Sequence, residues 1–170
     1  MGCPFFPCLL MMFLMTLKMP KNIIISDTSC LIVLSRIQQL ELLKKMYETI
    51  IISKEVAEEF GEDLPPWVIV KEVSNKSFLR VLVGIVDLGE ASAIALALEH
   101  EDALLIVDDL KGRKEARRLG LRITGLLGVL LKCKQKGIIS EIKPLLEAMK
   151  NASFRISKEI ELFVLEKAGE

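Results

Sequence analysis

The sequence has little of the side-chain chemistry on which many enzymes and metal proteins depend. Its 170 residues include one histidine, one tryptophan and one tyrosine, and its four cysteines form no CxxC pair. These shortages argue against a Cys/His zinc site and a Ser-His-Asp hydrolase. Unpatterned cysteines indicate a reducing, cytoplasmic setting. An aromatic content of 5% argues against a surface that stacks nucleic-acid bases.

An excess of charge of one sign is also missing. The chain has 23 Lys and Arg against 23 Asp and Glu, so any attraction to nucleic acid must come from a local patch. A composition of 51% hydrophobic and 27% charged residues suits a folded core with a soluble surface. The length fits one compact domain, which we place at residues 21–170.

Residues 1–20 form an apolar extension that we separate from this domain. The segment lacks the basic start of a signal peptide, contains Pro4 and Pro7, and is shorter than a membrane-spanning helix requires. We therefore expect no membrane anchor. We favour Met19 as the true start of translation, and the alternative is a short apolar arm that packs on a partner.

Apolar runs of strand length alternate with helical segments along the rest of the chain. The expected strands are 23–26, 50–52, 103–107 and 121–124, and the expected helices are 30–37, 40–47, 54–60, 90–99, 111–119 and 126–134, with two more before residue 167. This alternation predicts a three-layer α/β/α fold with a central, mainly parallel sheet. The secondary structure of residues 62–88 is left unassigned. Pro65-Pro66 breaks any helix, and residues 68–73 favour a strand. Residues 77–86 suit either a helix or a strand.

Two of the expected strands run directly into acids. Asp27 follows the first strand, and Asp108 and Asp109 follow the strand at 103–107. Because the carboxyl ends of parallel strands gather at one edge of a sheet, we expect these acids to meet there. An acid that closes a nearly continuous apolar strand is costly to bury without a purpose.

Other acids belong to helices that leave the same edge. Glu90 stands at a helix start, and Glu58 and Glu59 lie in the helix after the second strand. Singly, such residues are usually solvated caps, but clustered carboxylates repel one another and lose hydration. A divalent cation resolves that conflict. Bound Mg²⁺ or Mn²⁺ can activate water for attack on a phosphodiester, which makes metal-assisted hydrolysis the chemistry that these residues match best.

The only strongly basic region follows the second pair of acids. Nine basic residues lie between positions 111 and 136 against one acid, Glu115. The residues that we expect to hold an RNA backbone are Lys111, Arg113, Arg117 and Arg118. The alternative is an ordinary solvated helix face.

Several segments together resemble the PIN-domain family. They are IIISDTS at 23–29, VAEEF at 56–60, LGEASAIALA at 88–97 and LLIVDD at 104–109, with Gly112-Arg113 and Gly120–Gly125 after them. The chain looks most like a prokaryotic PIN branch of unknown function with a predicted role in nucleic-acid binding. The resemblance runs from residue 21 to the C-terminus.

The resemblance implies a metal-dependent ribonuclease fold related to VapC-type toxins, which cut RNA and are restrained by a co-encoded antitoxin. It also implies a homodimer. The catalytic residues that it indicates are Asp27, Glu59, Glu90 and Asp109. The metal ligands would be Asp27, Glu90 and Asp108 or Asp109. Glu58, Thr28 and Ser29 are further candidates, and Glu90 stands where many PIN nucleases have Asp.

These observations lead to one main functional hypothesis and its alternatives. We expect a Mg²⁺- or Mn²⁺-dependent endoribonuclease, the toxin of a toxin–antitoxin pair. The alternative is an inactive PIN-like module that binds RNA or a protein. Phosphoryl transfer of the dehalogenase kind is weaker, because Ser29 stands where that motif requires a second Asp.

Overall fold

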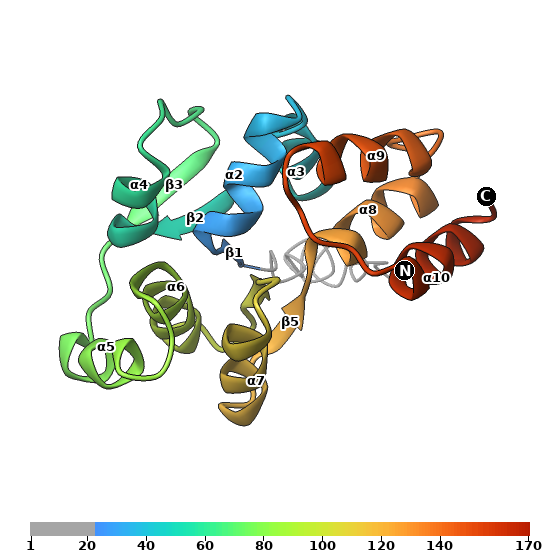
Figure 1. Ribbon diagram of the computed structural model, residues 1–170. Coiled ribbons are helices and arrows are strands. Elements are labelled where there is room, and N and C mark those ends of the chain that lie inside the picture. Colours follow the sequence, from blue (N-terminus) through green and yellow to red (C-terminus); the bar gives the residue numbers. More distant parts are fainter. Residues whose placement is uncertain (1–22) are drawn as a thin grey trace, which may run out of the picture.

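The computed structural model describes residues 23–170 (Figure 1). Its sheet has five strands in the order β3-β2-β1-β4-β5, and all neighbouring strands are parallel. The strands are β1 (Ile24–Ser26), β2 (Ile50–Ser53), β3 (Val68–Lys71), β4 (Leu104–Ile106) and β5 (Arg122–Thr124). The sheet is thus entirely parallel, as the alternation of elements predicts.

Helices cover both faces of the sheet. Within the described residues they are α2 (Thr28–Arg36), α3 (Glu41–Tyr47), α4 (Lys54–Phe60), α5 (Lys76–Val83), α6 (Leu88–Leu98), α7 (Leu110–Arg118), α8 (Leu126–Gln135), α9 (Lys143–Asn151) and α10 (Lys158–Ala168). In Figure 1, α5, α6 and α7 lie on one side, and α2, α3, α8 and α9 lie on the other. The predicted three-layer α/β/α fold is confirmed.

The two central strands, β1 and β4, are short and completely buried. They pair in register, with Ile25 opposite Leu105 and Ser26 opposite Ile106. The chain moves outward from β1 through β2 to β3 and then crosses to β4 on the other side of β1. The strand order therefore reverses between β1 and β4, which is the position where open parallel sheets form their binding sites.

The structure shows which elements residues 62–88, left unassigned from the sequence, form. β3 is an edge strand, and Ile69 and Val70 on it are 44% and 45% exposed. The following segment forms helix α5, where the Asn75 side chain accepts a hydrogen bond from the Phe78 backbone N–H at 3.0 Å. Asn75 is thus an ordinary N-cap, and the ambiguous residues after it are helical as far as Val83.

The predictions for residues 1–20 lie outside the described part of the chain. Between residues 23 and 170, none of the helices combines the length and the apolarity that a membrane span requires. The two described cysteines, Cys30 and Cys133, are buried free thiols.

Candidate acidic active site

Asp27 lies at the junction of β1 and α2 and is only 1% exposed. Its backbone N–H donates to the carbonyl of Ile106 in the neighbouring strand at 3.1 Å, so sheet pairing fixes its position. Its Oδ1 accepts the Cys30 N–H at 3.0 Å and caps α2. Its Oδ2 is buried and has no hydrogen-bond partner in the described structure. Burial chiefly, with a contribution from the nearby Asp108 charge, raises the pKa of Asp27 to about 6.

Asp108 follows β4 and lies at the start of α8. The Leu126 backbone N–H donates to both of its carboxylate oxygens, at 3.2 Å and 3.0 Å, and the Cys30 thiol donates to Oδ2 at 3.1 Å. A Cβ on Gly125 would stand 2.5 Å from Asp108 Oδ1. Only glycine at position 125 therefore lets this carboxylate approach α8 so closely, and the structure brings Asp108 beside Asp27.

Glu90 lies in the first turn of α6 and is 7% exposed. Burial raises its pKa to about 8, and the charges of Asp87, Asp109 and Asp27 add to that effect. A Cβ on Gly112 in α7 would stand 3.3 Å from the Glu90 carboxylate. Glu90 thus points toward the α7 start and interacts electrostatically with acids at the ends of both central strands.

Asp109 is exposed and caps α7: its Oδ1 accepts the N–H groups of Lys111 at 2.7 Å and Gly112 at 3.2 Å. These capping bonds use Oδ1 and leave Oδ2 available. Asp87 precedes α6 and is exposed, and no side-chain capping bond is formed there. Asp87 thus joins Asp109 as an acid near Glu90.

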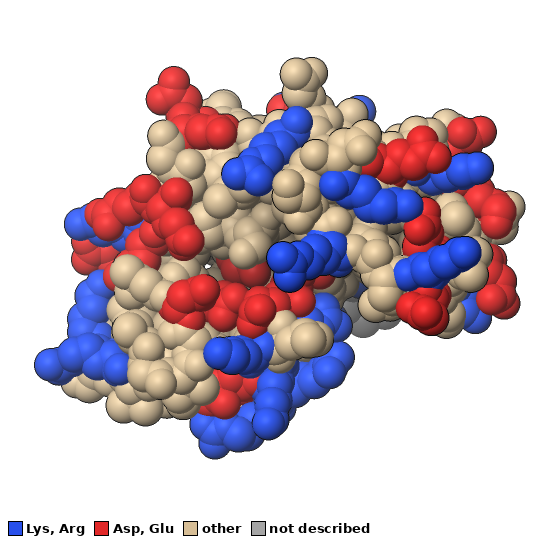
Figure 2. All heavy atoms as spheres, viewed as in Figure 1, with Lys and Arg blue, Asp and Glu red and all other residues tan. Residues whose placement is uncertain are grey.

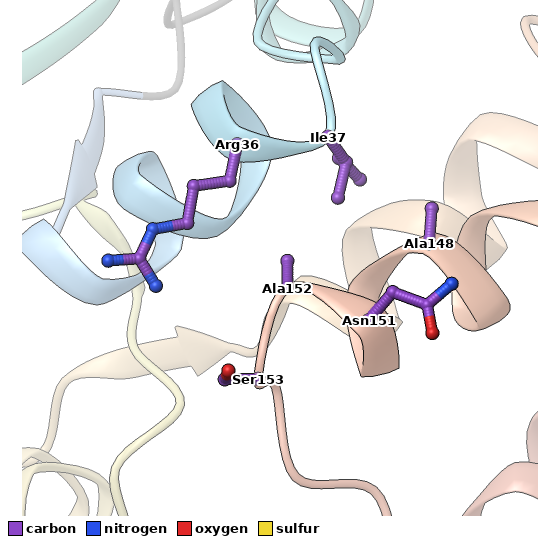
Figure 3. Close-up of a pocket in the computed structure, with 6 residues that line it drawn as sticks. All are labelled: Arg36, Ile37, Ala148, Asn151, Ala152 and Ser153. Carbon is purple, nitrogen blue, oxygen red and sulfur yellow. The ribbon is translucent and has the colours of Figure 1, made fainter.

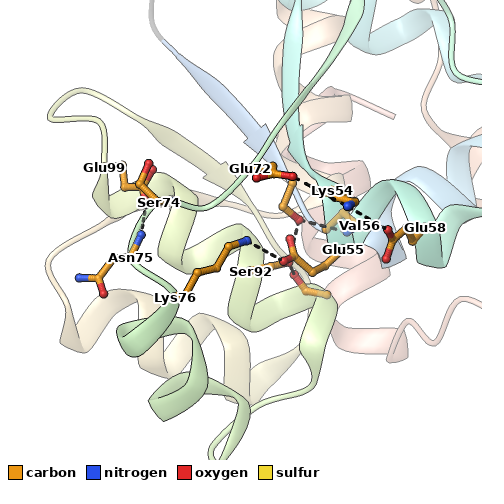
Figure 4. A network of polar contacts seen from close by, with 12 residues as sticks. Lys54, Glu55, Val56, Glu58, Glu72, Ser74, Asn75, Lys76, Ser92 and Glu99 are labelled. Atoms are coloured by element: carbon orange, nitrogen blue, oxygen red, sulfur yellow. Dashed lines mark hydrogen bonds and ion pairs between the residues drawn. The ribbon is translucent and has the colours of Figure 1, made fainter.

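The two glutamates of α4 have different surroundings. Glu59 Oε2 accepts a hydrogen bond from the Thr28 hydroxyl at 2.6 Å, which brings Glu59 to the start of α2. Glu58 is exposed and pairs with Lys54 at 3.9 Å (Figure 4). Ser29 is exposed in the first turn of α2. Glu59 and Thr28 therefore belong to the rim of the acidic site, whereas Glu58 has its ion pair on the exposed face of α4.

A chain of buried hydroxyls holds the start of α6 against β2. Ser92 donates to the Gly89 carbonyl at 2.9 Å, so its proton is used there and Ser53 must donate to Ser92 across their 2.7 Å contact. Ser53 in turn accepts the Val56 N–H at 3.0 Å and caps α4. The helix turn that carries Glu90 is thus tied to the sheet.

The four predicted RNA-binding residues differ in what they contact. Arg113 is half-buried, and its Nη1 donates to the Val107 carbonyl at 3.0 Å, directly before Asp108. Arg118 Nε donates to Glu115 at 2.9 Å, which neutralises part of its charge. Lys111 and Arg117 are exposed. Figure 2 shows acidic side chains gathered across the middle of the face above α6 and α7, with basic side chains around α7 below them.

The donor set of this site suits a hard divalent cation. Asp27 offers a buried oxygen without a partner, and burial, with the charges of neighbouring carboxylates, raises the pKa values of Asp27 and Glu90. Between residues 23 and 170, no three acidic, histidine or cysteine side chains already stand in an arrangement that holds one ion. Mg²⁺ commonly takes one or two carboxylates and keeps several waters, and the residues present fit that mode.

A separate cavity of about 510 Å³ lies where α2 and α9 end (Figure 3). Its lining residues are Arg36, Ile37, Ala148, Asn151, Ala152 and Ser153. None of them is an acid, so this cavity lacks the ligands that a divalent cation requires.

Sequence reasoning missed three residues of the acidic site. Cys30 follows Asp27 by three residues, which is the spacing of an N-cap and the N–H that it accepts. Asp87 directly precedes the helix that carries Glu90. Gly125 gave no usable signal, because its closeness to Asp108 depends on how α8 meets the sheet.

The fold and the site together define an α/β protein with an acidic centre at the switch point of a parallel sheet, which is the place between β1 and β4 where the strand order reverses. A family model described as a PIN domain matches residues 23–170, and the chain therefore belongs to the PIN-domain family. This family is of nuclease type, and its nucleases generally use divalent metal ions. Comparisons with curated proteins and with solved structures gave no match.

Proposed function

We propose that this protein is a Mg²⁺- or Mn²⁺-dependent endoribonuclease. The observation that carries the proposal is the carboxylate of Asp27: it is buried at the switch point, one oxygen has no partner, and Asp108 and Glu90 interact with it electrostatically. A bound cation would supply a water of lowered pKa and stabilise the leaving oxygen of a phosphodiester.

The residues of the chain have distinct roles in this proposal. Asp27 and Asp108 would hold the cation, and Glu90 and Asp109 would complete its surroundings directly or through water. Glu59 and Thr28, paired at the rim, would orient the bound phosphate or its water, together with Ser29. Arg113 places its guanidinium beside the end of β4, where it could neutralise a phosphate next to the acids.

The biological setting is proposed from the resemblance to VapC-type toxins. In that setting the protein is a cytoplasmic toxin that forms a homodimer, acts on RNA without a membrane, and is restrained by a co-encoded antitoxin. A small neighbouring reading frame whose product copurifies with this chain and suppresses cleavage would support that setting.

The test of the nuclease function is RNA cleavage by the purified full chain. We expect cleavage with Mg²⁺ or Mn²⁺, none in EDTA, and a loss of at least about a hundredfold in Asp27→Asn, because a buried amide cannot replace an anionic ligand. Asp63→Asn makes the same chemical change on an exposed loop and should cleave as the wild type does. Cleavage that persists in EDTA would refute the proposal.

A second candidate function, an inactive PIN-like module that binds RNA or a protein, is favoured by one observation. In the described residues no three potential ligands are preassembled for a metal ion. This alternative predicts RNA or protein binding that is insensitive to EDTA and to Asp27→Asn, without cleavage under any metal condition.

A further inference from the structure

Cys30 is the residue that contacts both acids at the ends of the central strands. Its backbone N–H donates to Asp27 Oδ1 at 3.0 Å, and its thiol donates to Asp108 Oδ2 at 3.1 Å. The side chain is 0% exposed and lies in the first turn of α2. A single residue thus links carboxylates that come from β1 and from β4.

The other hydrogen bonds of Asp27 and Asp108 do not connect one carboxylate to the other. Asp108 is held toward α8 by the Leu126 N–H, and Asp27 is held by strand pairing with Ile106. Asp27 Oδ2 is buried without a partner in the described structure, on the residue that Cys30 caps. The thiol is therefore the side chain that sets how the Asp108 carboxylate stands relative to that oxygen.

The thiol is suited to act as a donor alone. In its hydrogen bond to Asp108 Oδ2 the thiol is the donor, because a carboxylate oxygen accepts. The group therefore presents a hydrogen to the acids.

We propose that Cys30 is a positioning residue of the acidic site, whose thiol orients Asp108 so that it and Asp27 can share one divalent cation. This inference rests on the proposed metal-dependent function. Groups that hydrogen-bond a metal ligand fix its orientation, and their loss typically weakens metal affinity about 10- to 100-fold. We expect a loss of that size when the donor is removed.

The variants separate the hydrogen bond from the space that the side chain fills. Cys30→Ala removes the donor with little change of volume, whereas Cys30→Ser keeps a donor at the same position. Cys133→Ala is the matched control, because Cys133 is also a buried free thiol but lies in α8. Urea unfolding of each full-length variant checks that its fold is intact.

The measurement is the affinity for Mn²⁺, which is determined from the electron paramagnetic resonance signal of free Mn²⁺ and by calorimetry. We expect Cys30→Ala to weaken Mn²⁺ binding about tenfold or more. Cys30→Ser and Cys133→Ala should stay within about threefold of the wild type, below the range expected for a lost supporting group.

The outcomes distinguish this inference from the proposed function. If the wild type binds Mn²⁺ and folded Cys30→Ala binds it equally well, the inference fails and the nuclease function stands. If the wild type binds no Mn²⁺, both fail. If Cys30→Ala does not fold, Cys30→Ser decides: retained affinity supports the inference, and a tenfold loss in a folded protein overturns it.

Discussion

At the scale of single residues, Asp27 and Glu90 carry most of the electrostatic conflict in this protein. Asp27 and Glu90 are 1% and 7% exposed, and other carboxylates surround them. An ionised carboxylate in such surroundings lacks both hydration and a counter-charge. Without a cation, the folded protein therefore retains protons that the unfolded chain releases.

This conflict predicts the pH dependence of stability in metal-free buffer. The pKa of Asp27 rises from 3.8 to about 6 and that of Glu90 from 4.5 to about 8, so between these values the folded state binds more protons than the unfolded state. The contribution of these two groups to the free energy of unfolding should thus decrease as pH rises from about 4 to about 8. At about 1.4 kcal/mol per pH unit, Asp27 alone should account for about 3 kcal/mol. Urea unfolding across this range measures it.

Added Mg²⁺ should reverse the loss, because a ligand that binds only the folded state stabilises it. At pH 8 we expect Mg²⁺ to raise the melting temperature of the wild type and to have little effect on Asp27→Asn. Asp27→Asn should also flatten the pH dependence, whereas Asp63→Asn should leave it unchanged. If Mg²⁺ does not change the melting temperature of the wild type at pH 8, this account is wrong.

At the scale of elements, the sequence was sufficient where burial made the pattern strong. β1 and β4 are wholly buried and mainly apolar, and an acid follows each within two residues, so both strands and the meeting of Asp27 with Asp108 could be predicted. β3 was harder because an edge strand with Ile69 and Val70 exposed has no clear alternation. Element boundaries differ from the expected ones by a residue or two, as is usual at helix and strand ends.

The contacts between elements could not be predicted in the same way. The thiol of Cys30 reaches Asp108 only because β1 and β4 are neighbours in register. The approach of Asp108 to α8 requires the missing Cβ of Gly125. Such contacts depend on the three-dimensional packing of residues far apart in the sequence, which a local pattern does not encode.

The packing of α6 against α4 and α2 gives a prediction for Gly89. A Cβ there would stand 2.2 Å from Glu59 Oε2 and 2.7 Å from Thr28 Oγ1, so Gly89→Ala should push the exposed Glu59 away and break its bond to Thr28. A double-mutant cycle with Glu59→Ala and Thr28→Val, which removes the acceptor and the donor in turn, should give a coupling of about 1 kcal/mol in the wild type. The coupling should vanish in the Gly89→Ala background, measured by urea unfolding.

Gly84→Ala is the control for this cycle. A Cβ on Gly84 would meet the Val81 carbonyl at an ordinary 3.4 Å, so the coupling between Glu59 and Thr28 should persist in that background. A coupling that survives Gly89→Ala would show that Glu59 can reach Thr28 around an added methyl group.

At the scale of the whole molecule, the net charge of zero conceals a separation of charge. Acidic side chains occupy the middle of the face in Figure 2, and basic side chains surround α7 beside them. A polyanion approaching the acids would be repelled without a cation and attracted by the basic helix. RNA binding at this face should therefore depend on the bound cation and on the basic residues of α7. The contributions of the cation and of α7 can be measured separately.

The contribution of α7 is measured by the salt dependence of RNA binding in EDTA, where cleavage is absent. Each phosphate contact with a single strand contributes about 0.7 to the slope of log affinity against log salt. Lys111→Ala with Arg117→Ala should therefore reduce the slope by about 1.4, since both residues are exposed. Arg80 is an exposed residue of α5, and Arg80→Ala should leave the slope unchanged. If the double variant has the same slope as the wild type, Lys111 and Arg117 belong to an ordinary solvated helix face. RNA would then have to bind the acidic site through the metal ion, without these two side chains.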